Sequence, residues 1–246
     1  MKPISSPDQS ARGLLADSPD ALRYDNVTDD PYEVSGLIRS LMPAGVRVLD
    51  VGCGTGSVTL LANQGKGNEI LCIEPDEERC RLAKARGLQA HNEVLSPEFF
   101  ETHGAFDVIV FADVLEHLPS PAEILELAVR GLRPGGIVIV SVPNVAHWSV
   151  RLSLLFGKFE YTDVGILDST HLRWFTERSL RSFVRSCGLE IEAIRHTAGA
   201  TLPVYYDTFP LRFVPGRIKR PVVRFLTRLL PRLFACQHIL VGRKRS

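Results

Sequence analysis

The sequence lacks several features that define whole classes of protein. No stretch approaches the ~20 uninterrupted apolar residues of a membrane-spanning helix, and the first residues contain no apolar run that would suit a secretory leader. The pattern G-x-x-x-x-G-K-[ST] does not occur, which argues against an ATP-binding P-loop. The five cysteines are odd in number and none has zinc-ligand spacing. We therefore expect small, buried cysteines in a reducing cytoplasm.

Acidic residues are missing from the last part of the chain. No Asp or Glu follows Asp207, and this part contains ten of the 29 Lys and Arg residues. Residues 1–207 therefore carry 19 basic against 28 acidic side chains, although the 246 residues together have a net charge of +1. In the segment 212–235, arginines recur every three to four residues among apolar residues, and we expect Pro221 and Pro231 to break the helix that this spacing predicts.

The basic segment 212–235 can be explained in three ways. It can be a lid helix that packs on its own sheet and turns its arginines to solvent. It can bind an anionic membrane surface, where apolar insertion and basic attraction act together, so that a cytoplasmic protein becomes peripheral to the inner membrane. Nucleic acid is the least favoured partner, because the sequence contains no RNA-binding module and the rest of the chain is acidic.

Short apolar runs alternate with amphipathic segments along the chain. Strands are expected at 46–51, 69–74, 88–94, 106–113, 136–142, 189–196 and 238–244, and helices at 31–41, 57–64, 76–87, 121–132 and 176–188. This order predicts an α/β fold, namely a doubly wound, Rossmann-like, mostly parallel seven-stranded sheet with helices on both faces. We expect a flexible N-terminus at 1–22 and a single domain at 23–246. Lid or substrate insertions are expected at about 143–175 and 199–235.

The stretch VLDVGCGTGS (48–57) combines an apolar run, an acid and three alternating glycines. Such glycines let a ligand approach the backbone without hindrance from Cβ atoms. Their spacing is G-x-G-x-G and not the G-x-G-x-x-G of dinucleotide-binding proteins. The second strand ends in Glu74, where a carboxylate can accept both hydroxyls of a ribose. These residues predict a site for an adenosine with an unmodified ribose and do not require a pyrophosphate.

Four motifs resemble, in order over roughly 46–195, those of class I S-adenosylmethionine-dependent methyltransferases: VLDVGCGTG, CIEPD, FDVIVFADVLEHLPSP and LRPGGIVIVSVPN. Two further stretches, SVPNVAHWSVRLSLLFGKFEYTD and THLRWFT, resemble a bacterial subgroup related to ubiquinone-biosynthesis O-methyltransferases and methionine-biosynthesis W-type proteins. The resemblance implies S-adenosylmethionine as the cofactor. It also implies methyl transfer, with oxygen of a small molecule or of a sugar or glycan as the favoured acceptor.

The resemblance also implies which residues line the cofactor. The set is Asp50, Gly52, Cys53, Gly54, Gly56, Glu74, Glu93, Ala112 and Asp113. The residues at 50–56 would lie along the methionine and ribose, and Glu74 would take the ribose hydroxyls. Glu93, or Asn92 beside it, would lie near the adenine amine.

Two further pairs of residues would complete this pocket by the same resemblance. Ala112 and Asp113 follow the fourth strand and would lie beside the sulfonium. Tyr24 and Asp25 would close the pocket from the N-terminal side.

Three histidines, His117, His147 and His171, fall where the acceptor should bind. Methyl transfer needs mainly alignment of the acceptor, and a hydroxyl acceptor also needs a base. His171 is the favoured base, because THLRWFT resembles a signature of the relatives. Each histidine also has a structural explanation: His117 can orient its loop, and His147 can stack beside Trp148. No metal is expected, because the motifs that carry these histidines resemble a metal-free family.

Other polar residues and other functions remain open on the sequence alone. Secondary candidates for holding a polar acceptor are Glu116, Asn144, Tyr161, Asp163 and Asp168. One alternative function is a non-catalytic or regulatory methyltransferase-like partner protein. Another is an NAD-dependent oxidoreductase, which would need the dinucleotide spacing that is missing.

Overall fold

The computed structural model describes residues 22, 25, 27–207 and 211–245. Most of the predicted flexible segment 1–22, and also Tyr24, lie outside the described residues. The five cysteines are free and buried, as predicted.

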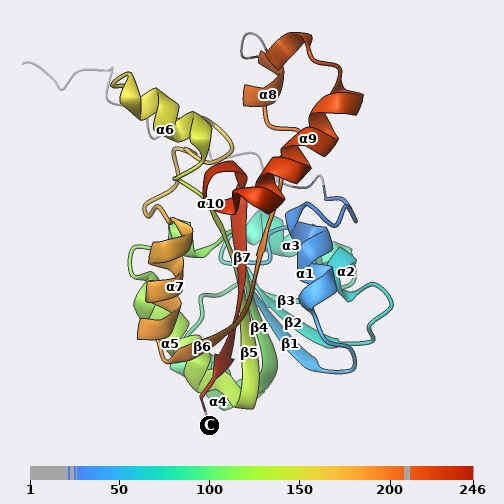
Figure 1. Ribbon diagram of the computed structural model, residues 1–246. Coiled ribbons are helices and arrows are strands. Elements are labelled where there is room, and N and C mark those ends of the chain that lie inside the picture. The colour runs from blue at the N-terminus through green and yellow to red at the C-terminus, as the bar shows by residue number, and fades with distance from the viewer. Residues whose placement is uncertain (1–21, 23–24, 26, 208–210, 246) are drawn as a thin grey trace, which may run out of the picture.

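The structure is built on one seven-stranded sheet with the order β3-β2-β1-β4-β5-β7-β6 (Figure 1). The strands are β1 (Arg47–Val51), β2 (Glu69–Ile73), β3 (Gln89–His91), β4 (Phe106–Ala112), β5 (Leu132–Pro143), β6 (Leu189–His196) and β7 (Gln237–Lys244). The first five strands pair in parallel, whereas β7 runs antiparallel to both β5 and β6. The predicted mostly parallel, Rossmann-like sheet is therefore confirmed.

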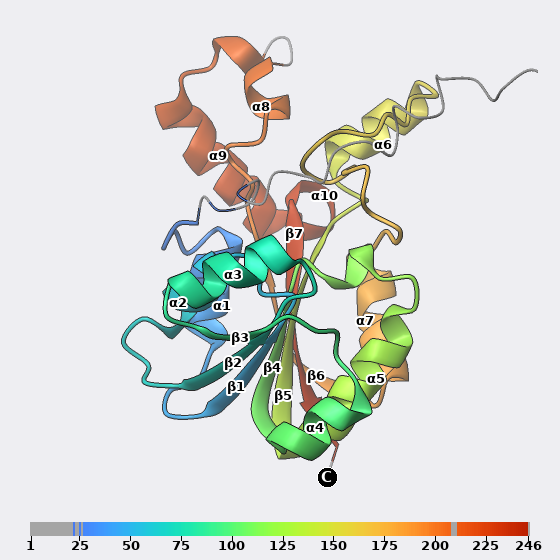
Figure 2. The ribbon, with the colours of Figure 1, turned by 180° about the vertical axis from the view of Figure 1, so that it is seen from behind.

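Helices cover both faces of the sheet (Figures 1 and 2). One face carries α1 (Val34–Leu41), α2 (Ser57–Asn63) and α3 (Glu77–Ala85), and the other carries α4 (Pro97–His103), α5 (Pro121–Gly131) and α7 (Glu177–Ser186). Strand β4 shows why its sequence has almost no polar residues. Val108 and Val110 belong to one core, and Ile109 and Phe111 belong to the other. Each such buried side chain contributes roughly 1.5–3 kcal/mol.

Local signals in the sequence set several helix boundaries. The Asp76 side chain accepts a hydrogen bond from the backbone N–H of Arg79, 2.8 Å away, and so caps α3. Thr176 and Ser179 form a reciprocal capping box at the start of α7, in agreement with the helix predicted from residue 176. Helix α4 was not predicted, although Ser96 caps it and Pro97 occupies its first turn. The predicted strand at 88–94 is correspondingly shorter and ends at His91.

Two arms leave the same end of the sheet on opposite sides (Figures 1 and 2). The first, within 143–175, contains α6 (Trp148–Leu155). The second, within 199–235, contains α8 (Val204–Asp207), the 3₁₀ turn η3 (Leu211–Phe213), α9 (Gly216–Leu229) and α10 (Pro231–Phe234). They lie above the carboxyl ends of the parallel strands, where ligands bind in open α/β sheets.

The expected break at Pro221 was wrong. Helix α9 runs through this residue, and the helix direction changes only at Leu230, directly before Pro231. Pro221 lies in the second turn of α9 and is exposed, so the carbonyl that it leaves without a donor can be hydrated. Among the described residues, no helix is both long enough and apolar enough to cross a membrane.

Candidate active site

The glycine turn between β1 and α2 has left-handed backbone at all three glycines. The φ angles of Gly52, Gly54 and Gly56 are +72°, +58° and +81°. A Cβ atom on Gly52 would lie 2.8 Å from Val114, and one on Gly56 would lie 2.2 Å from Leu88. A Cβ atom on Gly54 would meet nothing within 4 Å. Two of the glycines are therefore required by packing, and Gly54 faces open space from which a ligand can approach.

Glu74 lies against this turn, as its position after β2 predicts. One carboxylate oxygen accepts the backbone N–H of Gly54 at 2.8 Å, and the other accepts that of Asp76 at 3.0 Å. The residue is 5% exposed. The parallel pairing of β1 with β2 brings the two loops together, so a buried carboxylate is held beside the turn.

Asp50, the neighbour of the turn inside β1, has an unsatisfied oxygen. Its Oδ2 accepts a hydrogen bond from the hydroxyl of Thr59, whereas its buried Oδ1 has no hydrogen-bond partner among the described residues. Burial, together with the nearby charge of Glu74, raises the pKa of Asp50 to about 6. A buried acceptor of this kind fits a ligand that brings a hydrogen-bond donor or a positive charge.

Asp25, in the segment before α1, contacts the residues of the glycine turn. Its carboxylate accepts hydrogen bonds from the hydroxyls of Thr55 and Ser57, and it forms an ion pair with Arg86 at 2.6 Å. The hydrogen bonds from Arg86 hold the pKa of Asp25 well below its usual range. The segment before α1 is thereby fastened to the turn, where the resemblance placed it.

Of the two residues suggested for the adenine end, Asn92 lies beside Glu74. Its side-chain amide donates to the carbonyl oxygens of Glu74 and Pro75, at 3.0 and 2.9 Å. Glu93 instead places a carboxylate oxygen 3.6 Å from Nδ1 of His91.

Asp113 follows β4 and points back toward the sheet. Its carboxylate accepts hydrogen bonds from the hydroxyl of Ser141 and the amide of Gln237, both at 2.8 Å. Burial raises its pKa to about 6. In the described part of the chain, Asp113 is the single residue other than glycine with a positive φ, +55°. Such backbone conformations at a residue other than glycine cluster at functional sites, and this one stands at the end of β4, directly after Ala112.

Glu116, His117 and His171 form one cluster beside Asp113. The His117 and His171 rings lie 4.8 Å apart, and one ligand atom from each of the three residues lies within 4.8 Å of the others. Glu116 is 1% exposed, and neither of its carboxylate oxygens has a hydrogen-bond partner within the described ranges. Burial, with the nearby charge of Asp113, raises the pKa of Glu116 well above its usual value. Such a set can exchange protons or hold a divalent cation.

His171 has a geometry suited to a base. Its Nδ1 lies 3.2 Å from the carbonyl oxygen of Ile166. In the tautomer that donates from Nδ1 to this carbonyl, the lone pair is on Nε2. His117 Nδ1 lies 3.2 Å from both the hydroxyl and the carbonyl oxygen of Thr170, which orients its ring and ties the loops after β4 and before α7 together.

His147 belongs to a different part of the molecule. Its Nε2 lies 3.1 Å from the hydroxyl of Tyr205, and its ring lies 5.7 Å from that of Trp148. Burial lowers its pKa to about 4, so it is neutral at physiological pH. The contacts of His147 therefore anchor α8 to the start of α6 and match its structural explanation.

The secondary candidates divide in the same way. Asn144 is fully buried and donates to the carbonyl of Ala235 at 2.9 Å, a structural role. Asp168 is fully buried and accepts hydrogen bonds from the N–H and hydroxyl of Thr170, so it shapes the loop that presents His171. Tyr161 and Asp163 are exposed on the first arm.

Comparison with known proteins identifies the family of this chain. A profile of the family described as "Methyltransferase domain" matches residues 25–194. The chain belongs to this family. It is a class I methyltransferase whose cofactor is S-adenosylmethionine. Two curated relatives, ubiquinone biosynthesis O-methyltransferases from Xanthomonas axonopodis and Thiobacillus denitrificans, are 28% and 29% identical. The alignments cover 67% and 61% of this chain and 71% and 67% of the relatives.

Solved structures support the fold of the methyltransferase. A Haloferax volcanii methyltransferase in complex with the Trm112 activator has a TM-score of 0.59 at 17% identity and covers 92% of this chain and 96% of its own. A SAM-dependent methyltransferase from Archaeoglobus fulgidus has a TM-score of 0.55 at 17% identity, with 86% and 93% covered. The [4+2]-cyclase SpnF has a TM-score of 0.53 at 19% identity, with 87% and 80% covered, so the fold alone does not define the reaction.

The residues around the turn fit S-adenosylmethionine. Gly54 leaves open space, the carboxylate of Glu74 borders it, and Asp50 offers an unsatisfied acceptor. None of the relatives named above is an oxidoreductase, in agreement with the missing dinucleotide spacing. The sequence indicates Glu116 only as a secondary candidate, because the burial of its carboxylate depends on loops that are remote in the chain.

Proposed function

We propose that this methyltransferase acts on a hydroxyl oxygen of a small-molecule or sugar acceptor that binds at the carboxyl end of β4. The observation that carries the proposal is the buried carboxylate of Glu116 beside His117 and His171, which has no hydrogen-bond partner among the residues that the structure describes. A hydroxyl acceptor must lose a proton, and a positioned base typically contributes roughly 10²–10⁴-fold to such a step. The names of the relatives, which are O-methyltransferases, support oxygen as the acceptor atom.

In this proposal the cofactor half of the site binds and orients. S-adenosylmethionine supplies a methyl group that is already activated by its sulfonium. Glu74 accepts hydrogen bonds from the ribose hydroxyls, and Asp50 accepts one from the polar end of the amino-acid part. Gly54 allows close approach, and Asp25 closes the turn. The chain's largest contribution is alignment of the two reactants, on the order of 7–11 kcal/mol.

The acceptor half then handles the proton. Nε2 of His171 takes the proton from the acceptor hydroxyl as the hydroxyl oxygen bonds to the methyl carbon and the methyl–sulfur bond breaks. The nearby Glu116 carboxyl then releases its own proton to solvent, and its carboxylate stabilises the positive imidazole. The raised pKa of Glu116 keeps this carboxyl neutral until a positive charge forms, so the site avoids a permanently buried, unpaired charge.

The test is transfer of radiolabelled methyl groups to a panel of phenols, catechols and sugars. His171→Ala should lower turnover at least tenfold while S-adenosylmethionine affinity stays nearly unchanged. Normal turnover in this variant would remove His171 as the base. If the protein binds the cofactor but labels nothing, in the panel or in cell extract, the alternative of a non-catalytic partner protein is correct instead.

We further propose that the second arm binds an anionic membrane surface. Because an α-helix has about 3.6 residues per turn, the residues of α9 fall into three stripes. The buried stripe is Lys219, Val223 and Thr227; the exposed apolar stripe is Ile218, Val222, Phe225 and Leu229; the exposed basic stripe is Arg217, Arg220 and Arg228. A narrow buried stripe between an apolar and a basic stripe suits a helix that lies in a lipid interface.

This membrane proposal is tested by sedimentation with vesicles of phosphatidylcholine, with and without phosphatidylglycerol. Phe225→Glu should reduce sedimentation with anionic vesicles, and salt should weaken binding of the wild type. Leu60→Glu, on an exposed apolar residue of α2, is the matched control and should bind normally. Equal sedimentation of wild type and Phe225→Glu would exclude the proposal. Cytoplasmic and peripheral localisation stays a prediction that this test sharpens.

A further inference from the structure

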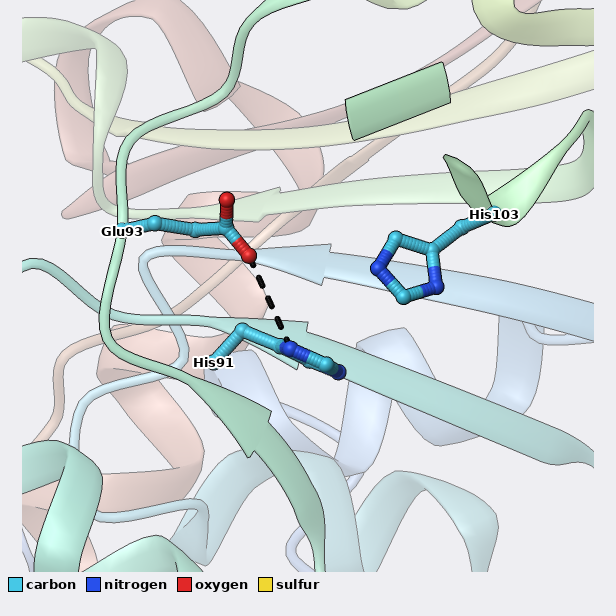
Figure 3. Close-up of side chains that lie close together, drawn as sticks. All are labelled: His91, Glu93 and His103. Atoms are coloured by element: carbon cyan, nitrogen blue, oxygen red, sulfur yellow. Dashed lines mark ion pairs between the residues drawn. The ribbon is translucent and has the colours of Figure 1, made fainter. Parts of the chain in front are cut away.

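A second group of metal-ligating side chains lies outside the proposed acceptor site, at the free edge of the sheet. His91 ends the edge strand β3, Glu93 follows it by two residues, and His103 ends α4. One ligand atom from each of the three residues lies within 4.8 Å of the others. Figure 3 shows the Glu93 carboxylate turned toward His91, with the His103 ring pointing toward these two residues from the opposite side. Two histidines and a carboxylate are thus brought together from two separate elements.

We propose that His91, Glu93 and His103 bind a transition-metal cation, with Zn²⁺ as the representative ion. Two imidazole nitrogens with one carboxylate form a ligand set that suits Zn²⁺ and its neighbours, whereas Mg²⁺ and Ca²⁺ prefer oxygen ligands alone. With metal–ligand bonds of about 2.0–2.1 Å, adjacent ligand atoms in a tetrahedral site lie about 3.3 Å apart. The 3.6 Å between Nδ1 of His91 and the carboxylate of Glu93 is already close to this spacing.

The two histidines are held in place without a metal. The carbonyl of His91 accepts the N–H of Glu74 at 3.0 Å, and His91 is in parallel register with Ile73. The ring of His103 lies 4.5 Å from the buried ring of Phe99, and the backbone carbonyl of His103 accepts a hydrogen bond from Arg47. Fixed backbone and ring positions lower the cost of assembling a site, so only Glu93 and small side-chain rotations need to adjust.

The side chains are also accessible to an ion in solution. The side chains of His91 and Glu93 are 36% and 42% exposed. The site therefore needs no opening of the core, and its open face leaves room for water to complete the coordination.

A cation bound at this place would stabilise the loop that follows β3. Asn92, between the two ligands His91 and Glu93, donates to the carbonyl of Glu74. A cation that ties Glu93 to α4 would hold this short loop against the wall of the cofactor pocket. This consequence rests on the proposed role of Glu74 in binding the ribose, whereas metal binding itself does not. The proposal departs from the expectation of a metal-free protein, and it also assigns Glu93 to a metal in place of adenine.

The test is Zn²⁺ titration of protein stripped with a chelator, without cofactor or acceptor, read by calorimetry and by the number of ions bound per chain. We expect His91→Ala and His103→Ala each to lower affinity at least tenfold and to remove one ion per chain. Glu101→Gln, on the exposed side of α4, is the matched control and should bind as the wild type does. Absence of Zn²⁺ binding by the wild type, or unchanged binding in both histidine variants, would overturn the proposal.

Two further measurements keep the test decisive. Because Glu116, His117 and His171 could also hold a cation, Glu116→Gln should retain the ion assigned here, and loss of all binding in that variant would contradict the assignment. Melting of each variant in chelator checks its fold, and Glu93→Gln replaces the alanine variants where they unfold. Zn²⁺ at a hundredfold excess over its dissociation constant should raise the wild-type melting temperature by about 5 °C or more. An unchanged melting temperature together with no Zn²⁺ binding in the titration would count against the site. Neither the melting measurement nor the titration depends on methyl transfer.

Discussion

The cofactor half and the acceptor half of the proposed site are built differently. The cofactor half, the turn 52–57 with Asp50, Glu74 and Asp25, consists of left-handed backbone and hydrogen-bonded carboxylates, and one buried oxygen of Asp50 has no partner among the described residues. The acceptor half, Glu116 with His117 and His171, contains a buried carboxylate without a hydrogen-bond partner in the described residues. A cofactor that a whole family shares can be bound largely through backbone geometry. A particular acceptor must instead supply hydrogen-bond partners to side chains that lack them.

The largest expected effect is a loss of cofactor affinity when a side chain is added at Gly54. Gly54→Val should weaken S-adenosylmethionine binding more than a hundredfold, because its side chain would fill the space over the turn. Both Gly54 and the exposed Gly45 have a left-handed backbone and open surroundings, so Gly45→Val carries a similar conformational cost, roughly 1–2 kcal/mol. Calorimetry on both variants separates occlusion from strain. Equal affinities in the two would show that the space over Gly54 is not the binding site.

The second largest expected effect is a loss of turnover on substitution of Glu116, without a loss of cofactor binding. Glu116→Gln keeps the shape of the side chain but cannot ionise, so it should lower kcat roughly 10²-fold. Its dissociation constant for S-adenosylmethionine should stay within about threefold of the wild-type value, and the exposed Glu123→Gln should change neither quantity. A variant that loses cofactor affinity and retains kcat would reverse the assignment of Glu116 to the acceptor half.

The third effect measures how firmly the N-terminal segment closes the turn. Asp25→Asn removes the ion pair with Arg86 and weakens two hydroxyl contacts, so cofactor affinity should fall about tenfold with little change in acceptor KM. Asp29→Asn, which breaks the exposed pair with Arg39, is the comparison and should leave affinity unchanged. Similar losses in both variants would point to a general loosening of this segment.

The smallest expected effect is a change in the pH dependence of stability on substitution of Asp113, which lies between the cofactor half and the acceptor half. Asp113 has a folded-state pKa of about 6, above the ordinary value of 3.8, so the folded chain holds its proton to higher pH than the unfolded chain does. Its ionisation therefore costs stability as pH rises from about 4 to 6, and the loss persists above that range. Relative to wild type, Asp113→Asn should gain about 1–2 kcal/mol between pH 4.5 and pH 7.5 in denaturant unfolding. The exposed Asp163→Asn should show no such gain, and a wild-type-like pH profile in Asp113→Asn would contradict the raised pKa.

The same contrast explains what sequence could predict. The sheet, the helices with clear caps and the glycine turn follow from patterns within a few residues, as at Asp76 and Thr176. Glu74 was predictable because parallel strands end at one edge of a sheet. The pairing of His117 with His171, and the separation of both from His147, depends on loops more than 50 residues apart in the chain, and no local pattern encodes it. The α4 helix was missed even though Ser96 and Pro97 signalled its start.

Strand β7 has a consequence for how the molecule is made. It lies between β5 and β6, yet every other strand of the sheet precedes it in the chain. A nascent polypeptide that has emerged only as far as β6 therefore displays two unpaired strand edges, the kind of surface that promotes aggregation. Premature termination before Gln237 should accordingly yield insoluble fragments, and chaperone demand during synthesis should be greatest in the interval when the second arm has emerged but the closing strand has not.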